Sequence, residues 1–365
     1  MMLIRRFLLL FVALAGILVP AVASGAVPGD APRVVSLDEA IRIALEQNRS
    51  IINARLDYQD AEVGLRQAEA NNLVQPSPVA LIQARHRLEI AARSVDLARL
   101  DVELEVKERY YGVLRAQDLL AIAQEALDVS ERQLNVAVQR FENGTGTRAD
   151  VLSAEHQVAS ARADVAQAEE GYELALMAFR MSLGLALGEP VVPDPDFALE
   201  AGGAVDFEAD LAHALANRIE ILQVLSGIEA ARKQVEVVRN DGTPVLALEA
   251  SEVALAKVLN QLEIARSGIE LEIRQLYAAL KNAERRIPVL EQGVAKAEED
   301  LRIAQQLYDV NMAPLVQVLG AQVALAKAKA DHTHGIYDLS LARARYDRAV
   351  VRWAHAGDMA GAGGS

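Results

Sequence analysis

The sequence predicts an all-α protein built from two copies of one long antiparallel coiled-coil hairpin. Apolar residues recur at steps of three and four along residues 113–141 and again along 151–179. The same pattern returns in register in the second half of the chain, where Phe141 corresponds to Tyr308. Hydrophobic residues make up 52% of the chain but aromatic residues only 4%, which is typical of seams that alternate bulky and small side chains. An internal duplication of this kind determines the fold more strongly than any short motif.

Each hairpin has a short turn between its arms. The first turn, Glu142–Thr147, is rich in glycine and threonine, the residues that end one helix and cap the next. The second turn spans Val310–Pro314. The predicted organisation is a signal peptide (1–26), a first repeat (27–190, tip near 142–148), a linker (191–205), a second repeat (206–353, tip near 309–314) and a flexible tail (354–365).

The N-terminus has the three parts of a secretory signal. Arg5 and Arg6 precede a short apolar run, and Ala21–Ala23 provides an A-x-A cleavage site. Ser24–Ala26 is a second candidate site, and an uncleaved membrane anchor is the alternative interpretation. Because a membrane-spanning helix needs about 20 apolar residues, the run favours a cleaved signal and an exported protein.

In the first repeat, Val27–Val35 is expected to be an extended lead-in with two prolines. Ser36 and Glu39 form a capping-box pattern. Three helices are expected before the first tip, separated by breaks near Asn48 and at residues 71–78; they span residues 37–47, 50–70 and 79–139.

The second repeat follows the same plan with a small difference in length. Residues 211–218 resemble 41–48 at an offset slightly larger than that between the hairpins, and a break at Asn240–Pro244 matches the earlier one. The next helix is expected to continue to Asp309 with a kink at Pro288, because proline lacks an amide donor. The last arm is expected to end near Trp353.

Composition excludes several classes of function. The net charge of −14 argues against a nucleic-acid partner, since phosphate binding requires a basic surface. The chain has no cysteine, so it forms neither disulfides nor Cys-ligated metal sites. It contains no phosphate-binding loop or nucleophile elbow, which predicts a protein without cofactors that is not an enzyme.

The repeated tips carry a resemblance to a known family. The first carries the motif Arg140–Thr145 followed by Asp150–Val151–Leu152 and Ala154, and the second carries Leu307–Tyr308 with Val318–Leu319, Ala321 and Gln322. Ser36–Ala40 adds to the pattern. Over roughly Ser36 to Arg352, the chain resembles the TolC-type outer membrane efflux proteins.

The resemblance implies a homotrimeric α-helical barrel that crosses the periplasm and is associated with the outer membrane. Such a protein is the passive exit duct of a tripartite efflux or type I secretion system. Its tips face a periplasmic adaptor (membrane fusion protein) and an inner-membrane pump, which chooses the cargo. The implied adaptor contacts are Gly144, Thr145, Thr147, Asn311, Met312 and Pro314, and the implied pore entrance is formed by Asp150 and Gln317.

Two departures from the family pattern are visible. Residues 71–84 and 240–250 are too short for two membrane-spanning strands of about 9–11 residues and a turn. The transmembrane β-barrel is therefore expected to be missing, with Leu73–Val74 and Val245–Leu248 as strand stubs at most. Gln317 and Gly320 also replace acidic residues found near the second tip in some relatives.

Several assignments have simpler alternatives. The glycine- and threonine-rich tip could be only a turn, and Asp150 could stabilise a helix N-terminus instead of lining a pore. A metal site at His332 and His334 is disfavoured, because residues two apart point to different helix faces. The large seam residues are expected to be packing residues; they are Tyr172, Phe179, Tyr308 and Tyr346. The alternative for the whole chain is a periplasmic coiled-coil adaptor or structural rod without a channel.

Overall fold

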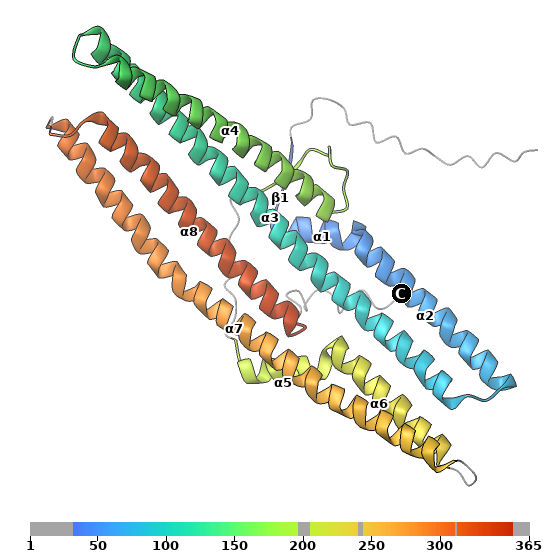
Figure 1. Ribbon diagram of the computed structural model, residues 1–365. Coiled ribbons are helices and arrows are strands. Elements are labelled where there is room, and N and C mark those ends of the chain that lie inside the picture. The colour runs from blue at the N-terminus through green and yellow to red at the C-terminus, as the bar shows by residue number, and fades with distance from the viewer. Residues whose placement is uncertain (1–31, 196–204, 240–243, 311, 353–365) are drawn as a thin grey trace, which may run out of the picture.

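The computed structural model describes residues 32–195, 205–239, 244–310 and 312–352, so the predicted signal peptide and tail lie outside the described residues. Within these ranges the chain folds into eight helices and two short strands (Figure 1). The prediction of a mainly helical protein with long antiparallel helices is confirmed. In chain order the elements are β1 (Arg33–Val35), α1 (Leu37–Gln47), α2 (Arg49–Val74), α3 (Pro78–Glu142), α4 (Arg148–Ser182), β2 (Val191–Pro193), α5 (Phe207–Asn217), α6 (Ile219–Val238), α7 (Val245–Asp309) and α8 (Leu315–Ala349).

The duplication is present in the lengths of the helices. Helices α3 and α7 each have 65 residues, and α4 and α8 each have 35. The offset along the chain from the start of α3, at Pro78, to the start of α7, at Val245, is the same as the offset from α4 to α8. The offset from α1 to α5 equals that from α2 to α6 and is slightly larger. The three-residue difference therefore lies between the start of α2 or α6 and the start of the following long helix.

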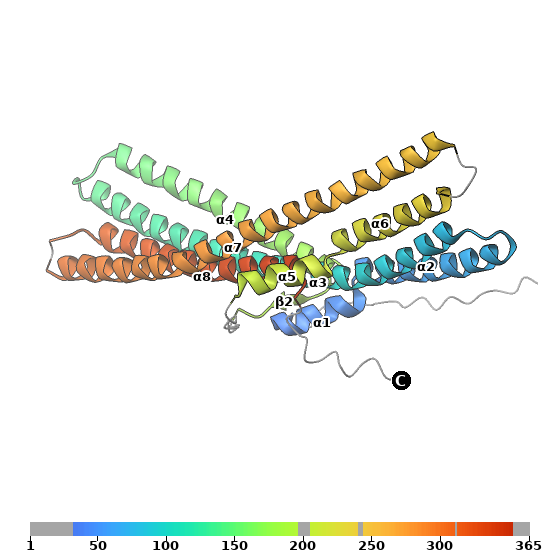
Figure 2. The same ribbon diagram turned by 90° about the horizontal axis from the view of Figure 1, so that it is seen from below.

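The two repeats lie side by side along one long axis. The C-terminal ends of α3 and α7 lie at one end, and the C-terminal ends of α2 and α6 lie at the other (Figures 1 and 2). Helix α3 joins the repeats, because it packs against α2 and α4 of its own repeat and against α6 and α8 of the other. Among the described residues, no helix combines the length and hydrophobicity needed to cross a membrane.

The ends of several helices differ from the sequence expectation. Leu73 and Val74 form the last turn of α2, and Val245 to Leu248 form the first turn of α7, so neither segment is a strand stub. The α2–α3 turn is only residues 75–77, where Ser77 N donates to Asn72 Oδ1 at 2.7 Å. Pro78 then occupies the first turn of α3, where its missing amide donor costs nothing.

The Ser36 cap forms only in part. Ser36 Oγ accepts from Glu39 N at 3.2 Å, as predicted. The Glu39 carboxylate, however, pairs with Arg33 of β1, and no return bond to the cap is formed. Arg33, six residues before Glu39, therefore competes successfully for the carboxylate, since both groups of that ion pair are charged, whereas the cap amide is neutral.

The start of the predicted linker is structured. Strand β2 pairs with β1 in parallel register, with Arg33 opposite Val191 and Val35 opposite Pro193. The predicted linker (191–205) thus begins with three residues of strand, whereas residues 196–204 lie outside the described part. Both Val35 and Val191 are buried, so apolar burial against α3 stabilises this two-stranded sheet.

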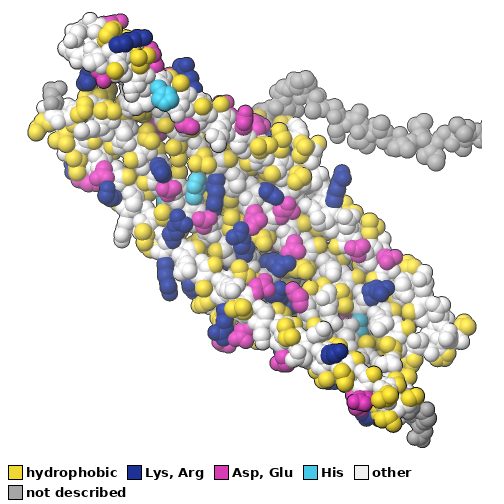
Figure 3. All heavy atoms as spheres, in the orientation of Figure 1, with side chains coloured by type: hydrophobic (Ala, Val, Ile, Leu, Met, Phe, Trp, Pro, Cys, Tyr) yellow, Lys and Arg dark blue, Asp and Glu magenta, His cyan; other side chains and the backbone are white. Residues whose placement is uncertain are grey.

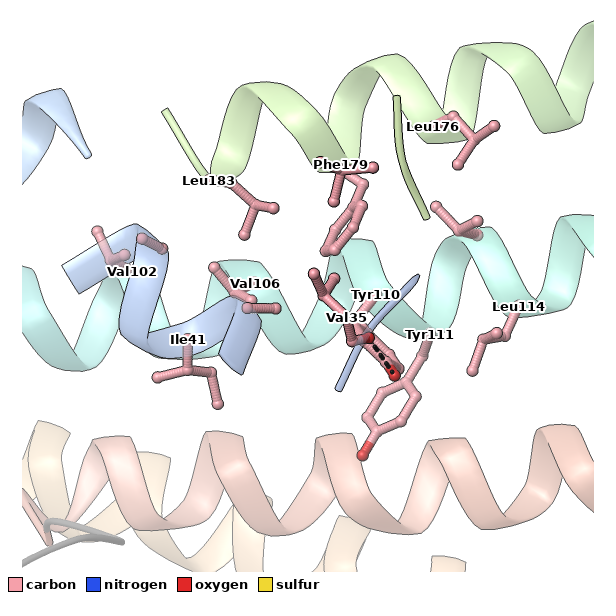
Figure 4. Close-up of a cluster of buried hydrophobic side chains, with 14 of the residues drawn as sticks. Val35, Ile41, Val102, Val106, Tyr110, Tyr111, Leu114, Leu176, Phe179 and Leu183 are labelled. Atoms are coloured by element: carbon pink, nitrogen blue, oxygen red, sulfur yellow. Dashed lines mark hydrogen bonds between the residues drawn. The ribbon is translucent and has the colours of Figure 1, made fainter. Parts of the chain in front are cut away.

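Tyr110 of α3 anchors the first core. Its hydroxyl lies 2.9 Å from Asp194 O and 3.2 Å from Val35 O, and it accepts from Asp194 N at 3.0 Å. Figure 4 shows Phe179 of α4 pointing toward the same tyrosine, and the two rings meet edge to face at 5.7 Å. Burial raises the pKa of Tyr110. The hydroxyl therefore stays protonated and connects α3 to the sheet.

The second core is built around Tyr346 of α8. The Tyr346 hydroxyl donates to Asp210 Oδ2 at 2.9 Å, and Arg352 pairs with the same carboxylate. Asp210 is buried although it carries a charge, which requires such partners. Its counterpart in the first repeat is Ala40 and that of Tyr346 is Phe179. The two halves thus share a backbone plan but use different side-chain chemistry at their centres.

Candidate functional site

The first tip closes around one carbonyl group. Arg140 O accepts from Thr145 N at 2.8 Å, from Gly146 N at 2.9 Å and from Thr145 Oγ1 at 3.1 Å. Gly144 has φ +69°, the left-handed conformation that ends many helices and that glycine adopts without steric cost. These bonds satisfy the last carbonyls of α3 and leave the tip residues facing solvent.

Thr147 and Asp150 fix the start of α4. Asp150 N donates to Thr147 Oγ1 at 3.2 Å, and Thr147 N donates to Asp150 Oδ2 at 2.8 Å, which completes a capping box. The backbone hydrogen bond from Thr147, followed by the bond from its side chain, holds the pKa of the Asp150 carboxyl below its usual value. The carboxylate therefore takes part in capping the helix, while remaining exposed beside the tip.

The second tip repeats this backbone arrangement with other side chains. Leu307 O accepts from Met312 N at 2.8 Å and from Ala313 N at 3.1 Å, as Arg140 O does in the first tip. Pro314 precedes α8 without a side-chain cap, and Gln317 N donates to Pro314 O at 3.0 Å. Asn311 lies outside the described residues. The exposed Gln317 occupies the position that corresponds to Asp150.

The two tips present different surfaces. Charged residues surround the first tip, at Arg140, Glu142, Arg148 and Asp150. In the second tip Met312 is 77% exposed and Val310 is 61% exposed. One end of the molecule therefore combines a polar tip and an apolar tip with the same backbone shape.

Phe141 and Tyr308 are not buried, although the seam pattern predicts that they are. Both are exposed, at 43% and 42%, because they lie in the last turn before each tip, where no further turn of the partner helix covers them. Phe179 and Tyr346 are fully buried, and Tyr172 packs partly buried against the first core. The seam pattern is thus reliable along the helices but not at their tips.

The two histidines of α8 point to different helices. His332 Nε2 lies 3.8 Å from Glu291 of α7, whereas His334 Nε2 lies 3.2 Å from Asp118 of α3. Among the described residues, no group of three or more potential metal ligands comes together. These histidines join α8 to its neighbours on two sides.

Sequence reasoning missed a ladder of charged pairs between α3 and α8. The pairs lie outside the apolar seams, and the first three recur at seven-residue steps along α3. That heptad spacing of charged residues was a readable signal, but the partner helix could not be read from it. The pairs are Asp101–Arg348, Glu108–Arg345, Arg115–Asp338 and Asp118–His334.

The sequence of the first hairpin matches a known family. Residues 79–185, which cover nearly all of α3, the first tip and α4, match the family model described as outer membrane efflux protein. The first hairpin is thus similar to the TolC-type outer membrane efflux proteins. The resemblance predicted from the duplicated tip motif is thereby confirmed.

Two curated relatives and a solved structure are similar to this chain. The chain is 29% identical to protein CyaE of Bordetella pertussis over 170 residues, and 28% identical to alkaline protease secretion protein AprF of Pseudomonas aeruginosa over 150 residues. These alignments cover 46% and 40% of this chain but only 36% and 31% of the relatives, so the chain spans about a third of their length. The outer membrane protein VceC of Vibrio cholerae has the same fold, with a TM-score of 0.65 at 18% identity, over 86% of this chain and 95% of VceC.

Proposed function

We propose that this protein is the passive exit duct of a tripartite efflux or type I secretion system, joining an inner-membrane pump and its periplasmic adaptor to the outer membrane. The match of the first hairpin to the outer membrane efflux protein model supports this assignment, as does the similarity to AprF, which is named as a protease secretion protein. A duct of this kind is a non-enzymatic transport protein. The proposal requires that several chains close a ring around a hollow axis.

The observation that carries the proposal is that equivalent faces of α3 and α7 have different packing within the chain. Helix α3 packs against α8 of the other repeat, but its counterpart α7 packs within the described chain mainly against α8, α6 and α5. The equivalent of α8 in the first repeat is α4. Within the described chain, no α4 helix packs on the face of α7 that corresponds to the α8-contacting face of α3. Helices α4 and α7 carry large apolar side chains that are more than half exposed; besides Val245 and Leu246 in the first turn of α7, they are Leu152, Leu174, Met181, Ile264, Leu271 and Val289.

A neighbouring copy can fill these faces. If α4 of one chain packs on α7 of the next, the contact between chains repeats the α3–α8 contact within the chain. An interface of this head-to-tail type closes into a ring when its rotation permits, and three chains is the number that the family resemblance implies. Burial of the exposed apolar residues of α4 and α7 would stabilise the homotrimer.

Chemical crosslinking tests this ring directly, because the chain has no cysteine of its own. The Glu108–Arg345 pair of α3 and α8 corresponds, through the offset between the two hairpins, to Gln275 of α7 and Ala178 of α4. A variant with Ala178→Cys and Gln275→Cys, treated with a short bismaleimide, is expected to give covalent dimers and trimers on a denaturing gel and no larger species.

The matched control is Glu108→Cys with Arg345→Cys, which links two helices of one chain. It is expected to remain a single-chain band of altered mobility, with the same native mass as the unmodified trimer. A ladder that continues beyond three chains would indicate an open filament. A particle that is monomeric by native mass spectrometry would instead favour the structural rod or adaptor.

The hairpin tips are the proposed docking surface for the adaptor and the pump. The residues concerned are Gly144, Thr145, Thr147, Asn311, Met312 and Pro314, with Asp150 and Gln317 at the proposed pore entrance. In support, both tips are solvent-exposed in the described residues and lie at one end of the molecule. The polar first tip and apolar second tip would alternate around the ring, so that a partner needs both kinds of contact.

Photocrosslinking in the producing cell tests the docking surface. A benzophenone amino acid at Thr145 or at Met312 is expected to trap a second polypeptide identified by mass spectrometry as a membrane fusion protein. The same amino acid at Leu187, an exposed residue between α4 and β2, is expected to trap none. Equal yields at all three positions would remove the tips from the proposal.

A further inference from the structure

The seam between α3 and α8 carries charges that the equivalent faces of α7 and α4 do not carry. Along α3 the first three members of the ladder of charged pairs recur at seven-residue steps, and each pairs with a residue of α8. Figure 3 shows acidic and basic side chains interspersed along the middle of the face on which α3 and α8 run side by side in Figure 1. The offset between the hairpins places uncharged residues at the equivalent positions of α7 and α4. The equivalent pairs are Gly268–Met181, Gln275–Ala178 and Asn282–Gly171.

These equivalent positions belong to two uncharged stripes, each on the side of its helix that faces away from its own hairpin partner. On α7 the members follow steps of three and four residues, and all are exposed; they are Ile264, Gly268, Leu271, Gln275, Ala278 and Asn282. On α4 all members except Ala178 are exposed; they are Gln167, Gly171, Leu174, Ala178 and Met181. The next position of the α7 stripe is Arg285, the counterpart of Asp118, and the α4 stripe has no acid to pair with it.

The apolar spacing of the two seams does not distinguish them. Leu341 of α8 packs in the first core with residues of α3 and is only 9% exposed, whereas its counterpart on α4, Leu174, is 65% exposed. Leu104 of α3 corresponds in the same way to Leu271 of α7, which is 58% exposed. Apolar side chains at the same spacing are thus covered between α3 and α8 and uncovered on α4 and α7. The seams differ most clearly at the charged positions.

The magnitudes indicate that the ladder acts on partner choice more than on stability. The side chains of the Glu108–Arg345 and Asp101–Arg348 pairs are 29–51% exposed, and ion pairs this exposed stabilise a fold only slightly. Burying one of these charges against an uncharged stripe is far more unfavourable, because the charge loses its hydration and gains no partner. Charges beside a coiled-coil seam select the partner helix in this way.

We propose that the ladder of charged pairs determines how copies of this chain pair with one another. The charged face of α3 accepts the charged face of α8, and the uncharged stripe of α7 accepts the uncharged stripe of α4 from a second copy. Contact of α3 with the α4 stripe of another chain would leave Asp101 and Glu108 buried without partners. The two repeats therefore alternate around the ring. This inference rests on the proposed ring and adds the residues that make its contacts selective.

Charges placed on one side of the contact between chains test the proposal. Ala178→Arg with Met181→Arg gives α4 the arginines that Arg345 and Arg348 provide in α8, but they then face uncharged residues of α7. In native mass spectrometry the trimer fraction is expected to fall by about tenfold or more, because the arginines would be buried without partners. The matched control is Gln157→Arg with Ala166→Arg, which adds the same charge to exposed residues of α4 off the stripe and is expected to remain trimeric.

Adding acids on the other side separates the effect of charge from that of side-chain size. Gly268→Asp with Gln275→Glu, combined with the two arginines on α4, supplies what Asp101 and Glu108 supply on α3 and is expected to restore the trimer. When this variant and the native chain are produced in one cell, each is expected to form trimers of its own kind, which differ in mass. Statistical mixing of the two chains would overturn the proposal, and so would failure of the acids to restore a trimer.

Removal of the ladder gives an independent measurement that needs no new charge. The variant Asp101→Asn, Glu108→Gln, Arg345→Ala and Arg348→Met leaves α3 and α8 with uncharged faces like those of α7 and α4. It is expected to give a mixture of assemblies that includes species larger than the trimer, because α3 can then also accept the α4 stripe of another chain. Circular dichroism checks that the helix content is unchanged. A single trimeric species would count against selection by the ladder.

The outcomes separate selection by the ladder from formation of the ring. A native trimer that persists in the arginine variant refutes selection alone. A native chain that is monomeric refutes the ring, and the variant without the ladder then decides the question of selection. Association that occurs only after removal of the ladder would support selection, whereas a monomer in both chains would refute it.

Discussion

Replacing Tyr110 with alanine is expected to destabilise the folded chain by about 3–5 kcal/mol, the usual cost of removing a large aromatic side chain from a core. The substitution leaves a cavity between Phe179 and Val35 and removes the hydroxyl that contacts both carbonyls of the strand ends. Because the sheet has only two strands of three residues, it is expected to detach from α3. Urea denaturation followed by circular dichroism measures the loss.

The matched variant Tyr110→Phe keeps the ring and removes only the hydroxyl. It is expected to cost about 0.5–1.5 kcal/mol, because the Asp194 carbonyl loses the hydroxyl donor, whereas the Asp194 amide keeps its bond to Val35 O at 2.9 Å. Hydrogen exchange should report faster exchange at Arg33, whose amide donates to Pro190 O, in both variants. Equal stability of the phenylalanine variant and the native chain would show that packing alone holds the sheet.

Replacing Gly184 with valine is expected to cost about 3 kcal/mol or more, since steric overlap adds to backbone strain. Gly184 has φ +80°, and an added Cβ would meet Gln47 O at 2.7 Å. That backbone cannot shift easily, because Asn48 Nδ2 donates to Ser182 O at 2.9 Å within the buried junction of α1, α2 and α4. The thermal midpoint of unfolding measures the effect.

Gly144 offers the control for this substitution. It also has a positive φ, +69°, but an added Cβ would meet no atom within 4 Å. Gly144→Val is therefore expected to show backbone strain alone, about 1–2 kcal/mol. If the two variants lose the same stability, contact with the α1–α2 junction is not what selects glycine at position 184.

The hairpins were predictable because their information is local and repeated. The seam spacing determines which face of each helix is buried, and the second copy gives an independent reading of each boundary. The predicted end of the long helix of the second repeat, at Asp309, is confirmed. The 3-4 rhythm is less informative at the first and last turns, so α2 extends four residues past the expected Ala70.

The features that were missed depend on contacts between distant segments. Strands β1 and β2 pair residues 33–35 with 191–193, and three-residue strands are too short to show an alternating pattern. No feature of the sequence around Asp210 indicates its burial, because its partners Tyr346 and Arg352 come from the far end of the chain. Local spacing cannot reveal which carboxylate a distant tyrosine will meet.

The candidate site was predicted in position but not in detail. The tip residues lie at one end, as the duplicated motif indicated, and Thr147 with Asp150 shows how the turn is held. The contrast between a polar first tip and an apolar second tip could be predicted from the sequence, because Met312 occupies the position that Thr145 has in the first tip. What the tips contact depends on a partner surface that is encoded in another chain.

Because α3 and α7 share one length and α4 and α8 share another, the two hairpins reach the same height and would offer a partner a level rim. Deleting seven residues from each of the two helices of one hairpin would shorten that hairpin by about 10 Å, given a rise of 1.5 Å per residue. A partner that binds all the tips would then contact the longer hairpins only. Changes in hairpin length must consequently be inherited by both copies of the repeat together, whereas the opposite end has already tolerated a mismatch of three residues.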